Sequence, residues 1–346
     1  MNTIEIDNNI TETLVTEIRN ILASARAKVA HVVNNEQLMA YWSIGQIIVK
    51  HEQNGEIRAE YGKQTLRELS KSLTNEFGRG FSRSNLQNMR LFYLTHPICQ
   101  TLSGKLSWSH YCELLYISDA DRRGFYEKEC ERSGWSVREL KRQMETSLYE
   151  RLLLSNGKAN KEKVLRLAEK GNEIAKPEDI IKDPYVFDFL GIPEDKSIYE
   201  GDLEKTLVHH IEKFLLELGR GFMFVGKQQR VTVANEHYYV DMVFYNKILH
   251  SYVLIELKTK KLLPAAVGQL NMYLNYYAAE INEPGDNPPI GIILCTDKNE
   301  TDAQYALGGI SNTIFASHYT MVIPDKEVLI AQVEEVIKEL ETREGI

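Results

Sequence analysis

Cysteine is scarce in this sequence, and its placement argues against the two kinds of site that cysteine pairs usually build. The 346-residue chain has no Cys-x-x-Cys pair and no suitably spaced histidines beside its four cysteines, which are Cys99, Cys112, Cys130 and Cys295. Zinc sites and disulfide frameworks both depend on such spacing. We therefore predict reduced thiols, with neither a zinc site nor a disulfide.

Long apolar runs are also missing. No stretch approaches the roughly 20 apolar residues that a membrane span requires. The first five residues lack the basic and apolar regions of a secretory signal. We expect a cytoplasmic protein without a membrane partner. Its composition, 43% hydrophobic and 26% charged, is that of a globular chain long enough for about two domains.

The chain lacks the basic excess that is typical of nucleic-acid-binding proteins, because its net charge is −8. The charge is uneven, however. Residues 1–160 carry 21 Lys and Arg against 19 Asp and Glu, a balance of +2, and the remainder carries 20 against 30, a balance of −10. An acidic second half is still compatible with phosphate chemistry, because carboxylates hold cations that in turn bind phosphate.

The first half of the sequence has a helical pattern. Apolar residues recur three and four positions apart, and no strand-like alternation persists. We therefore predict an all-α N-terminal domain over residues 11–154. Ser82, and Ser136 with Glu139 three residues later, predict helix starts. Helices are expected over 11–33, 36–52, 60–77, 83–94, 107–117, 120–133 and 136–153.

A glycine-containing turn before Ser82 gives two of these helices the layout of a helix-turn-helix. Residues 58–90 hold seven basic and three acidic side chains, a balance of +4. Arg, Asn and Gln can contact base edges, so this corner is a candidate for reading DNA. Such corners are also common in plain helical bundles, and a structural role stays open. The candidate DNA-contacting residues are Arg79, Arg83, Asn85, Gln87 and Arg90.

A polar stretch over residues 155–176 predicts a linker, because its composition changes before Pro177 and Pro184. The remaining residues, 177–346, follow an αβββαβ order that predicts a mixed α/β domain. Helices are expected over 201–219 and 264–282, and strands over 222–233, 237–246, 251–259 and 289–296.

Two of the predicted strands bring charged residues together. Residues 238–245 and 251–258 are rich in β-branched and aromatic residues and flank a turn-like segment, so they predict a β-hairpin. Because strand side chains alternate between faces, Glu256 and Lys258 project together. With Asp241 on the first strand, this arrangement suits metal-assisted phosphodiester hydrolysis. The alternative is a solvated edge hairpin in which Glu256 simply pairs with Lys258.

The proposed chemistry needs a hard divalent cation. Mg²⁺ prefers oxygen ligands, which Asp241, Glu256 and the backbone carbonyl of Leu257 could provide. Mn²⁺ is the expected substitute. The Lys258 ammonium would orient the attacking water or stabilise the charged transition state.

Three further residues are candidates for the same site. Glu204, in the first helix of the second half, could supply a third carboxylate to the cation; the alternative is a solvated acid near a helix end. Gln269 and Tyr273 lie four positions apart, on one helix face, and could contact the phosphate backbone. The alternative for Tyr273 is packing within an apolar stripe.

The order of Glu204, Asp241, Glu256-x-Lys258 and Gln269-x-x-x-Tyr273 resembles the PD-(D/E)XK nuclease superfamily, and its last motif resembles the RecB-like branch. Val240 precedes Asp241 where the superfamily's leading motif has proline, a departure that leaves the ligand set intact. More closely, nearly the whole chain resembles the bacterial YhcG family. The segments that carry this likeness are 60–63, 76–82, 106–111, 217–228, 240–245 and 255–258.

The resemblance implies an α+β two-domain protein, with an all-α N-terminal domain and a restriction-endonuclease-like C-terminal core around a mixed sheet. It also implies a magnesium-dependent DNA endonuclease that acts on foreign, mobile or recombining DNA. The alternative is a module that binds DNA or assembles partners without cleavage. RNA stays open as a substrate, because the chemistry does not choose the sugar. A homodimer is expected if both strands are cut, since two cuts usually need two active sites.

Overall fold

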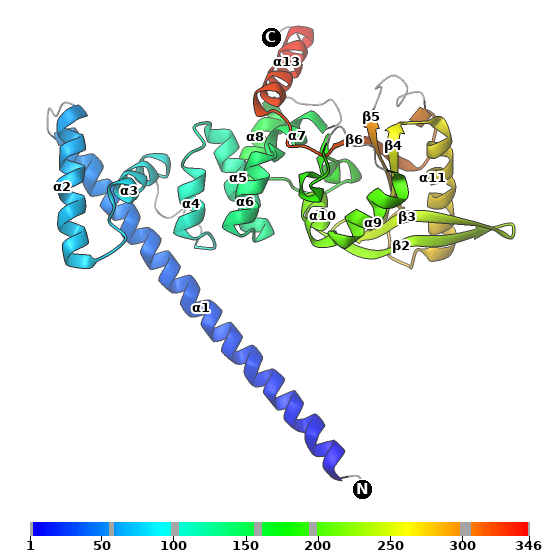
Figure 1. Ribbon diagram of the computed structural model, residues 1–346, viewed down its shortest axis with the longest axis horizontal. Coiled ribbons are helices and arrows are strands. Elements are labelled where there is room, and N and C mark those ends of the chain that lie inside the picture. Colours follow the sequence, from blue (N-terminus) through cyan, green and yellow to red (C-terminus); the bar gives the residue numbers. More distant parts are fainter. Residues whose placement is uncertain are drawn as a thin grey trace. The chain divides into compact units, whose positions relative to one another are not determined.

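The computed structural model describes residues 3–54, 59–97, 104–155, 161–193, 199–297 and 306–344 (Figure 1). The chain divides into two compact units. Unit 1 comprises residues 1–123 and 130–140, and unit 2 comprises residues 124–129 and 141–346. Among the described cysteines, Cys112 is half-buried and Cys130 and Cys295 are buried, while Cys99 lies outside the described residues.

Unit 1 is helical. Its largest element is α1 (Thr3–Asn54), one continuous helix where the sequence predicted two. Apolar residues of α1, α2 and α3 form a core that includes Ile48, Leu66, Leu86 and Met89. The helices that follow α1 are α2 (Ala59–Phe77), α3 (Arg83–Thr95) and α4 (Trp108–Leu114). The all-α prediction for this part of the chain is therefore confirmed.

The corner between α2 and α3 has the predicted layout. Gly78 and Gly80 adopt positive φ values of 84° and 125°, a conformation that glycine tolerates best. Ser82 then caps α3, because its side chain accepts a hydrogen bond from the Asn85 amide at 3.2 Å. The turn and the cap together fix where the second helix begins.

The next helices are α5 (Ala120–Ser133), α6 (Val137–Glu145), α7 (Leu148–Leu154) and α8 (Lys161–Lys170). The capping box before α6 is confirmed, with the Ser136 amide 2.6 Å from the Glu139 carboxylate. The predicted helix 136–153 is interrupted, however, because Ser147 adopts a left-handed φ of 53° between α6 and α7. Helix α8 occupies part of the segment that we predicted as a linker.

Unit 2 contains a six-stranded mixed sheet in the order β1-β6-β5-β4-β3-β2. Strands β4, β5, β6 and β1 pair in parallel, whereas β2, β3 and β4 form an antiparallel meander. The sequence did not predict β1 and β6. The strands are β1 (Tyr185–Val186), β2 (Phe222–Val233), β3 (Glu236–Asn246), β4 (Ser251–Lys261), β5 (Ile290–Asp297) and β6 (Thr313–Thr320).

Helices cover both faces of this sheet (Figure 1). One face carries Ile255 and Leu257 and packs against α9 (Glu200–His209) and α10 (Ile211–Leu218), which replace the single predicted helix. The other face packs against α11 (Pro264–Tyr276), which continues as the π-helical turn η5 (Tyr277–Ile281). The remaining elements are η3 (Pro177–Ile180), η4 (Asp188–Leu190) and α13 (Lys326–Glu344).

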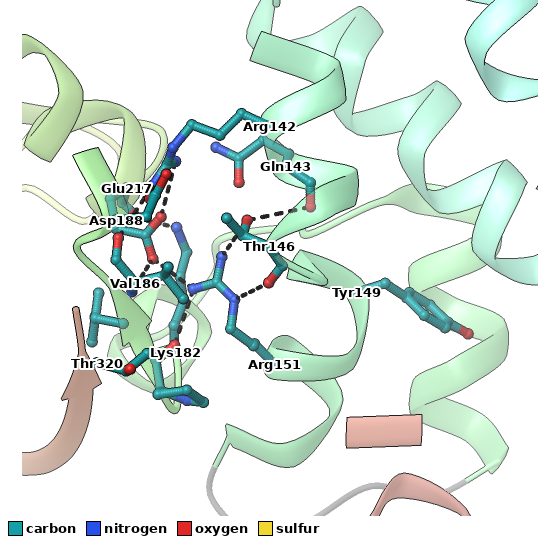
Figure 2. A network of polar contacts seen from close by, with 12 residues as sticks. Arg142, Gln143, Thr146, Tyr149, Arg151, Lys182, Val186, Asp188, Glu217 and Thr320 are labelled. Atoms are coloured by element: carbon teal, nitrogen blue, oxygen red, sulfur yellow. Dashed lines mark hydrogen bonds and ion pairs between the residues drawn. The ribbon is translucent and has the colours of Figure 1, made fainter. Parts of the chain in front are cut away.

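A buried ionic network joins α6, α7, α10 and β1 within unit 2 (Figure 2). Glu217 of α10 is 0% exposed and accepts hydrogen bonds from Arg151 at 2.5 Å, Arg142 at 3.3 Å and the Val186 amide at 3.0 Å. Lys182 donates to the Glu217 carbonyl. Burial alone would raise the pKa of Glu217, but the surrounding cations, Arg151 foremost, lower it to about 2. Segments from both halves of the sequence are thus part of one fold.

The N-terminal part of α1 differs from the other helices in its surface. Val15, Ile18, Leu22, Val29 and Val32 are each between 46% and 63% exposed, an unusual run of apolar side chains for a solvated helix. Among the described residues, no helix combines the length and hydrophobicity needed to cross a membrane.

Candidate active site

The predicted hairpin is confirmed, with β3 and β4 antiparallel and Met242 opposite Ile255. Since Ile255 and Leu257 are buried in the core beside α9 and α10, Glu256 projects from the opposite face of β4. Its carboxylate lies 3.4 Å from the Lys258 ammonium. The structure therefore places these two side chains together, as their spacing predicts.

Asp241 lies beside this pair, at the point where the backbones of β3 and β4 diverge. Its Oδ2 accepts a hydrogen bond from the Leu257 amide at 2.9 Å. Burial raises the pKa of Asp241 above its ordinary value, although the Leu257 hydrogen bond and the charge of Lys258 act in the opposite direction. The Leu257 amide thus orients a carboxylate that is partly removed from water.

Glu256 is the most buried acid of the site, at 2% exposed. Burial and the nearby charge of Asp241 raise its pKa to about 8. Burial alone would lower the pKa of Lys258, but the carboxylates of Glu256 and its neighbours outweigh this effect and raise it. Ionising all of these carboxyl groups at once would therefore place more negative charge in the site than one lysine offsets.

Glu204 approaches the same carboxylates from α9. It is 7% exposed, and burial followed by the charge of Asp241 raises its pKa, against a hydrogen bond from Gln228. The Gln228 side-chain nitrogen lies 2.6 Å from Glu204 and 3.3 Å from Asp241. Glu204 is thus connected to the hairpin through Gln228.

Gln269 and Tyr273 share one face of α11, as predicted. Gln269 donates to the Tyr273 hydroxyl at 2.6 Å, and that hydroxyl donates to the Tyr239 carbonyl at 3.2 Å. The Tyr273 ring is fully buried in the core between α11 and the sheet, so packing accounts for the ring. Gln269 is exposed and is the member of the motif that a substrate can reach.

The sequence analysis missed two residues that contact the predicted set. Glu200 lies 3.4 Å from the Lys258 ammonium and accepts a hydrogen bond from the Thr259 amide at 3.4 Å. Its position four residues before Glu204, on the same helix face, was an available signal. Gln228 had no such signal, because its contacts depend on a β-bulge.

The residues present fit a divalent cation. Glu256 Oε1 is buried without a hydrogen-bond partner in the described part of the chain, and three acids gather where burial penalises their charge. Hard oxygen ligands of this kind suit Mg²⁺. Within the described residues, however, no three His, Cys, Asp or Glu side chains form a ready-made metal cluster. The Gln228 amide lies between two of the acids.

The candidate DNA-contacting residues of unit 1 divide into two groups. Arg79, Arg83 and Gln87 are exposed. Arg90 instead pairs with Glu52 of α1 at 2.6 Å. The Asn85 side chain donates to the Gly80 carbonyl and accepts from Trp108 at 2.8 Å. Both are therefore engaged within the fold of unit 1.

Sequence comparisons match the two halves of the chain to known domains. Residues 178–334 match the YhcG PDDEXK nuclease domain, and residues 17–151 match the DUF1016 N-terminal domain. The chain is 39% identical over 344 residues to "Putative nuclease YhcG" of Escherichia coli (strain K12), and the match covers 90% of each chain. The second half of the chain is thus similar to a nuclease domain.

Solved structures with partial likeness include a repair endonuclease from Pyrococcus abyssi, with 18% identity and a TM-score of 0.25, and a complex of EndoMS with dsDNA, with 14% identity and a TM-score of 0.26. The matches cover 38% and 39% of this chain and 50% and 51% of those chains. The matched region thus spans about half the length of each of these two solved proteins. Likeness at this level carries no functional argument.

Proposed function

The chain belongs to the YhcG family of PD-(D/E)XK nuclease proteins, and on that premise we propose that it is a metal-dependent DNA endonuclease. Its catalytic centre in this proposal is the cluster formed by Asp241, Glu256 and Lys258. The observation that carries the proposal is the 3.4 Å contact of the Lys258 ammonium with Glu256, next to Asp241. Foreign, mobile or recombining DNA is the biological substrate that we propose from family resemblance.

Each residue of the cluster has a role in this proposal. Asp241 and Glu256 hold the cation, together with Glu204 and the Leu257 carbonyl. A bound Mg²⁺, or Mn²⁺ in its place, would supply neutralising charge for the phosphoryl oxygens and lower the pKa of the attacking water. Lys258 would orient the attacking water and stabilise the charge that develops on the phosphoryl group.

The residues around the cluster hold these groups in place. The Leu257 amide orients Asp241, and Glu200 keeps the Lys258 ammonium at the site through its 3.4 Å contact. Gln269 is exposed beside the buried Tyr273, and we assign it a contact with the DNA backbone. Lys258, anchored between two carboxylates, then needs little rearrangement before reaction.

Plasmid cleavage tests this proposal. We expect the wild type to nick or linearise supercoiled DNA with Mg²⁺ or Mn²⁺ and to be inactive in EDTA, and the Asp241→Asn variant to be inactive with metal. Asp202→Asn, the same change at an exposed position of α9, is the matched control and should cleave normally. A single-stranded RNA of similar length, incubated in parallel, determines whether the activity selects deoxyribose.

Two results would contradict the proposal. Cleavage that persists in EDTA or in Asp241→Asn would place the chemistry in other residues. An inert wild type that still shifts DNA in a gel would favour the alternative, a module that binds without cutting. The alternative is less economical, because binding alone does not require three carboxylates, two of them buried, and a lysine in one cluster.

We propose a separate DNA-contacting role for the α2–α3 corner. Arg79, Arg83 and Gln87 are exposed there, whereas the neighbouring Arg90 is ion-paired to Glu52. An Arg83→Ala variant should bind duplex DNA more weakly, with a shallower salt dependence, because one phosphate or base contact is lost. Unchanged affinity and salt dependence would assign this corner a structural role.

We further propose that the protein is a homodimer joined through α1. Its exposed apolar residues occupy alternating three- and four-residue steps at positions 15, 18, 22, 25, 29 and 32, the spacing of a coiled-coil seam. If two copies run antiparallel, with residue 20 at the centre, Glu12 of one copy lies level with Lys28 of the other, twice per dimer. This charge complementarity favours a second copy as the partner of the helix.

The molar mass in solution tests the dimer. Light scattering should give about twice the chain mass of 39.8 kDa for the wild type and the monomer mass for Leu22→Asp, which places a charge in the seam. Asn20→Asp adds the same charge on the opposite side of α1 and should leave the dimer intact. A monomeric wild type, or a dimeric Leu22→Asp, would contradict this interface.

A further inference from the structure

Gln228 of β2 lies opposite Asp241 of the neighbouring strand β3. The paired residues on either side of these two are Gln229 with Val240 and Lys227 with Met242. From this position the Gln228 nitrogen lies 2.6 Å from a Glu204 oxygen and 3.3 Å from an Asp241 oxygen. One amide therefore bridges acids that come from a helix and from a strand.

The backbone of Gln228 is unusual for a strand residue. Its φ is 46°, in the left-handed region that residues other than glycine rarely adopt. The residue closely follows the β-bulge between Phe224 and Gly226, and bulges often redirect side chains at functional sites. Strained positions of this kind persist where the surrounding structure enforces them, and they cluster at functional sites. Here the strained residue is the one that bridges the two acids.

A primary amide has two chemically different ends. Its N–H groups suit two carboxylates without a cation, whereas its oxygen is a hard ligand of the kind that Mg²⁺ and Mn²⁺ prefer. A cation held by Glu204 and Asp241 would be repelled by an N–H pointing between them. Rotation about the terminal side-chain bond, which is a soft torsion, exchanges the nitrogen for the oxygen without moving the backbone.

We propose that Gln228 is a residue of the metal site, whose N–H bridges Glu204 and Asp241 before loading and whose amide oxygen turns toward the cation after loading. The inference rests on the proposed function, because it requires that the cluster binds a divalent metal. It adds a neutral ligand to the acids and explains how Glu204, on a separate helix, is kept beside Asp241. Gln228 is thereby a positioning residue in one state and a ligand in the other.

Mn²⁺ titration of the full-length protein without DNA tests this inference. A Gln228→Met variant keeps the length of the side chain and removes the amide, so we expect Mn²⁺ affinity to fall about 10- to 100-fold. Gln228→Glu restores an oxygen ligand and should bind Mn²⁺ at least as tightly as the wild type. Gln229→Met, the same change at the next residue, is the matched control, because the Gln229 amide contacts only the Lys227 carbonyl in the described hydrogen bonds.

The opposite sign is expected if Gln228 merely fills the space between the acids. Removing a competing N–H would then leave Mn²⁺ affinity unchanged or increase it in Gln228→Met, and this result would overturn the inference while the nuclease proposal stands. A wild type that binds no Mn²⁺ and cleaves no DNA would overturn both. Circular dichroism of each variant separates a lost ligand from a lost fold.

Discussion

The Glu217→Gln substitution tests the energetic role of the ionic network in unit 2. The change removes the charge of a fully buried carboxylate and leaves the 0% exposed Arg151 without its ionic partner. Breaking a buried pair in this way costs about 3–5 kcal/mol. Arg151 keeps acceptors on Thr146 and Pro184, and Arg142 keeps Asp188 at 2.6 Å. We therefore expect the lower end, about 3 kcal/mol.

Thermal unfolding followed by far-ultraviolet circular dichroism measures this loss. For a unit of about 210 residues, 3 kcal/mol lowers Tm by roughly 6–12 °C. All three tryptophans lie in unit 1, so their fluorescence is an internal reference for the other unit. Glu212→Gln makes the same change at an exposed position of the same helix and should leave Tm nearly unchanged. A Glu217→Gln shift as small as the Glu212→Gln shift would refute the reasoning.

The ionic network, the candidate active site and the cap of α3 give three further predictions. Because folding lowers the pKa of Glu217 from 4.5 to about 2, its ionised form stabilises the protein above about pH 4.5, and this stabilisation is lost as the pH falls toward 2. The difference between the Tm at pH 6 and the Tm at pH 3 should therefore be smaller in Glu217→Gln than in the wild type. Because the pKa of Glu256 is raised to about 8, Mn²⁺ competes there with a proton, and calorimetric affinity should increase as the pH rises through 8; a flat profile would contradict this. Ser82→Ala removes the cap of α3 and should destabilise unit 1 by about 1 kcal/mol in urea unfolding followed by tryptophan fluorescence; an unchanged midpoint would show that the cap is dispensable.

The central hairpin could be predicted from the sequence because each signal there is local. Alternation of side chains along β4 determines that Glu256 and Lys258 share a face, and their 3.4 Å contact follows from that alternation. The cap at Ser82 and the capping box at Ser136 were equally readable, since the partners lie three residues apart. The fold class followed from these patterns and from the resemblance to a nuclease family.

The features that were missed depend on contacts between distant segments or on backbone detail. Strand β1 is two residues long and pairs with β6 across more than 130 residues, so no local pattern marks it. Glu217 meets Arg151 from 66 residues away, across the segment that we predicted as a linker. Gln228 reaches the site through a bulge and a left-handed backbone, neither of which alternation predicts.

The most direct test of the account is cleavage by a Lys258→Ala variant, measured together with its binding of Mn²⁺ and DNA. Lys261→Ala, an exposed lysine at the end of the same strand, is the control. The account predicts that Lys258→Ala still binds Mn²⁺ and DNA but no longer cleaves supercoiled plasmid, while Lys261→Ala cleaves like the wild type. Cleavage by Lys258→Ala at the wild-type rate would contradict the assignment of the catalytic centre.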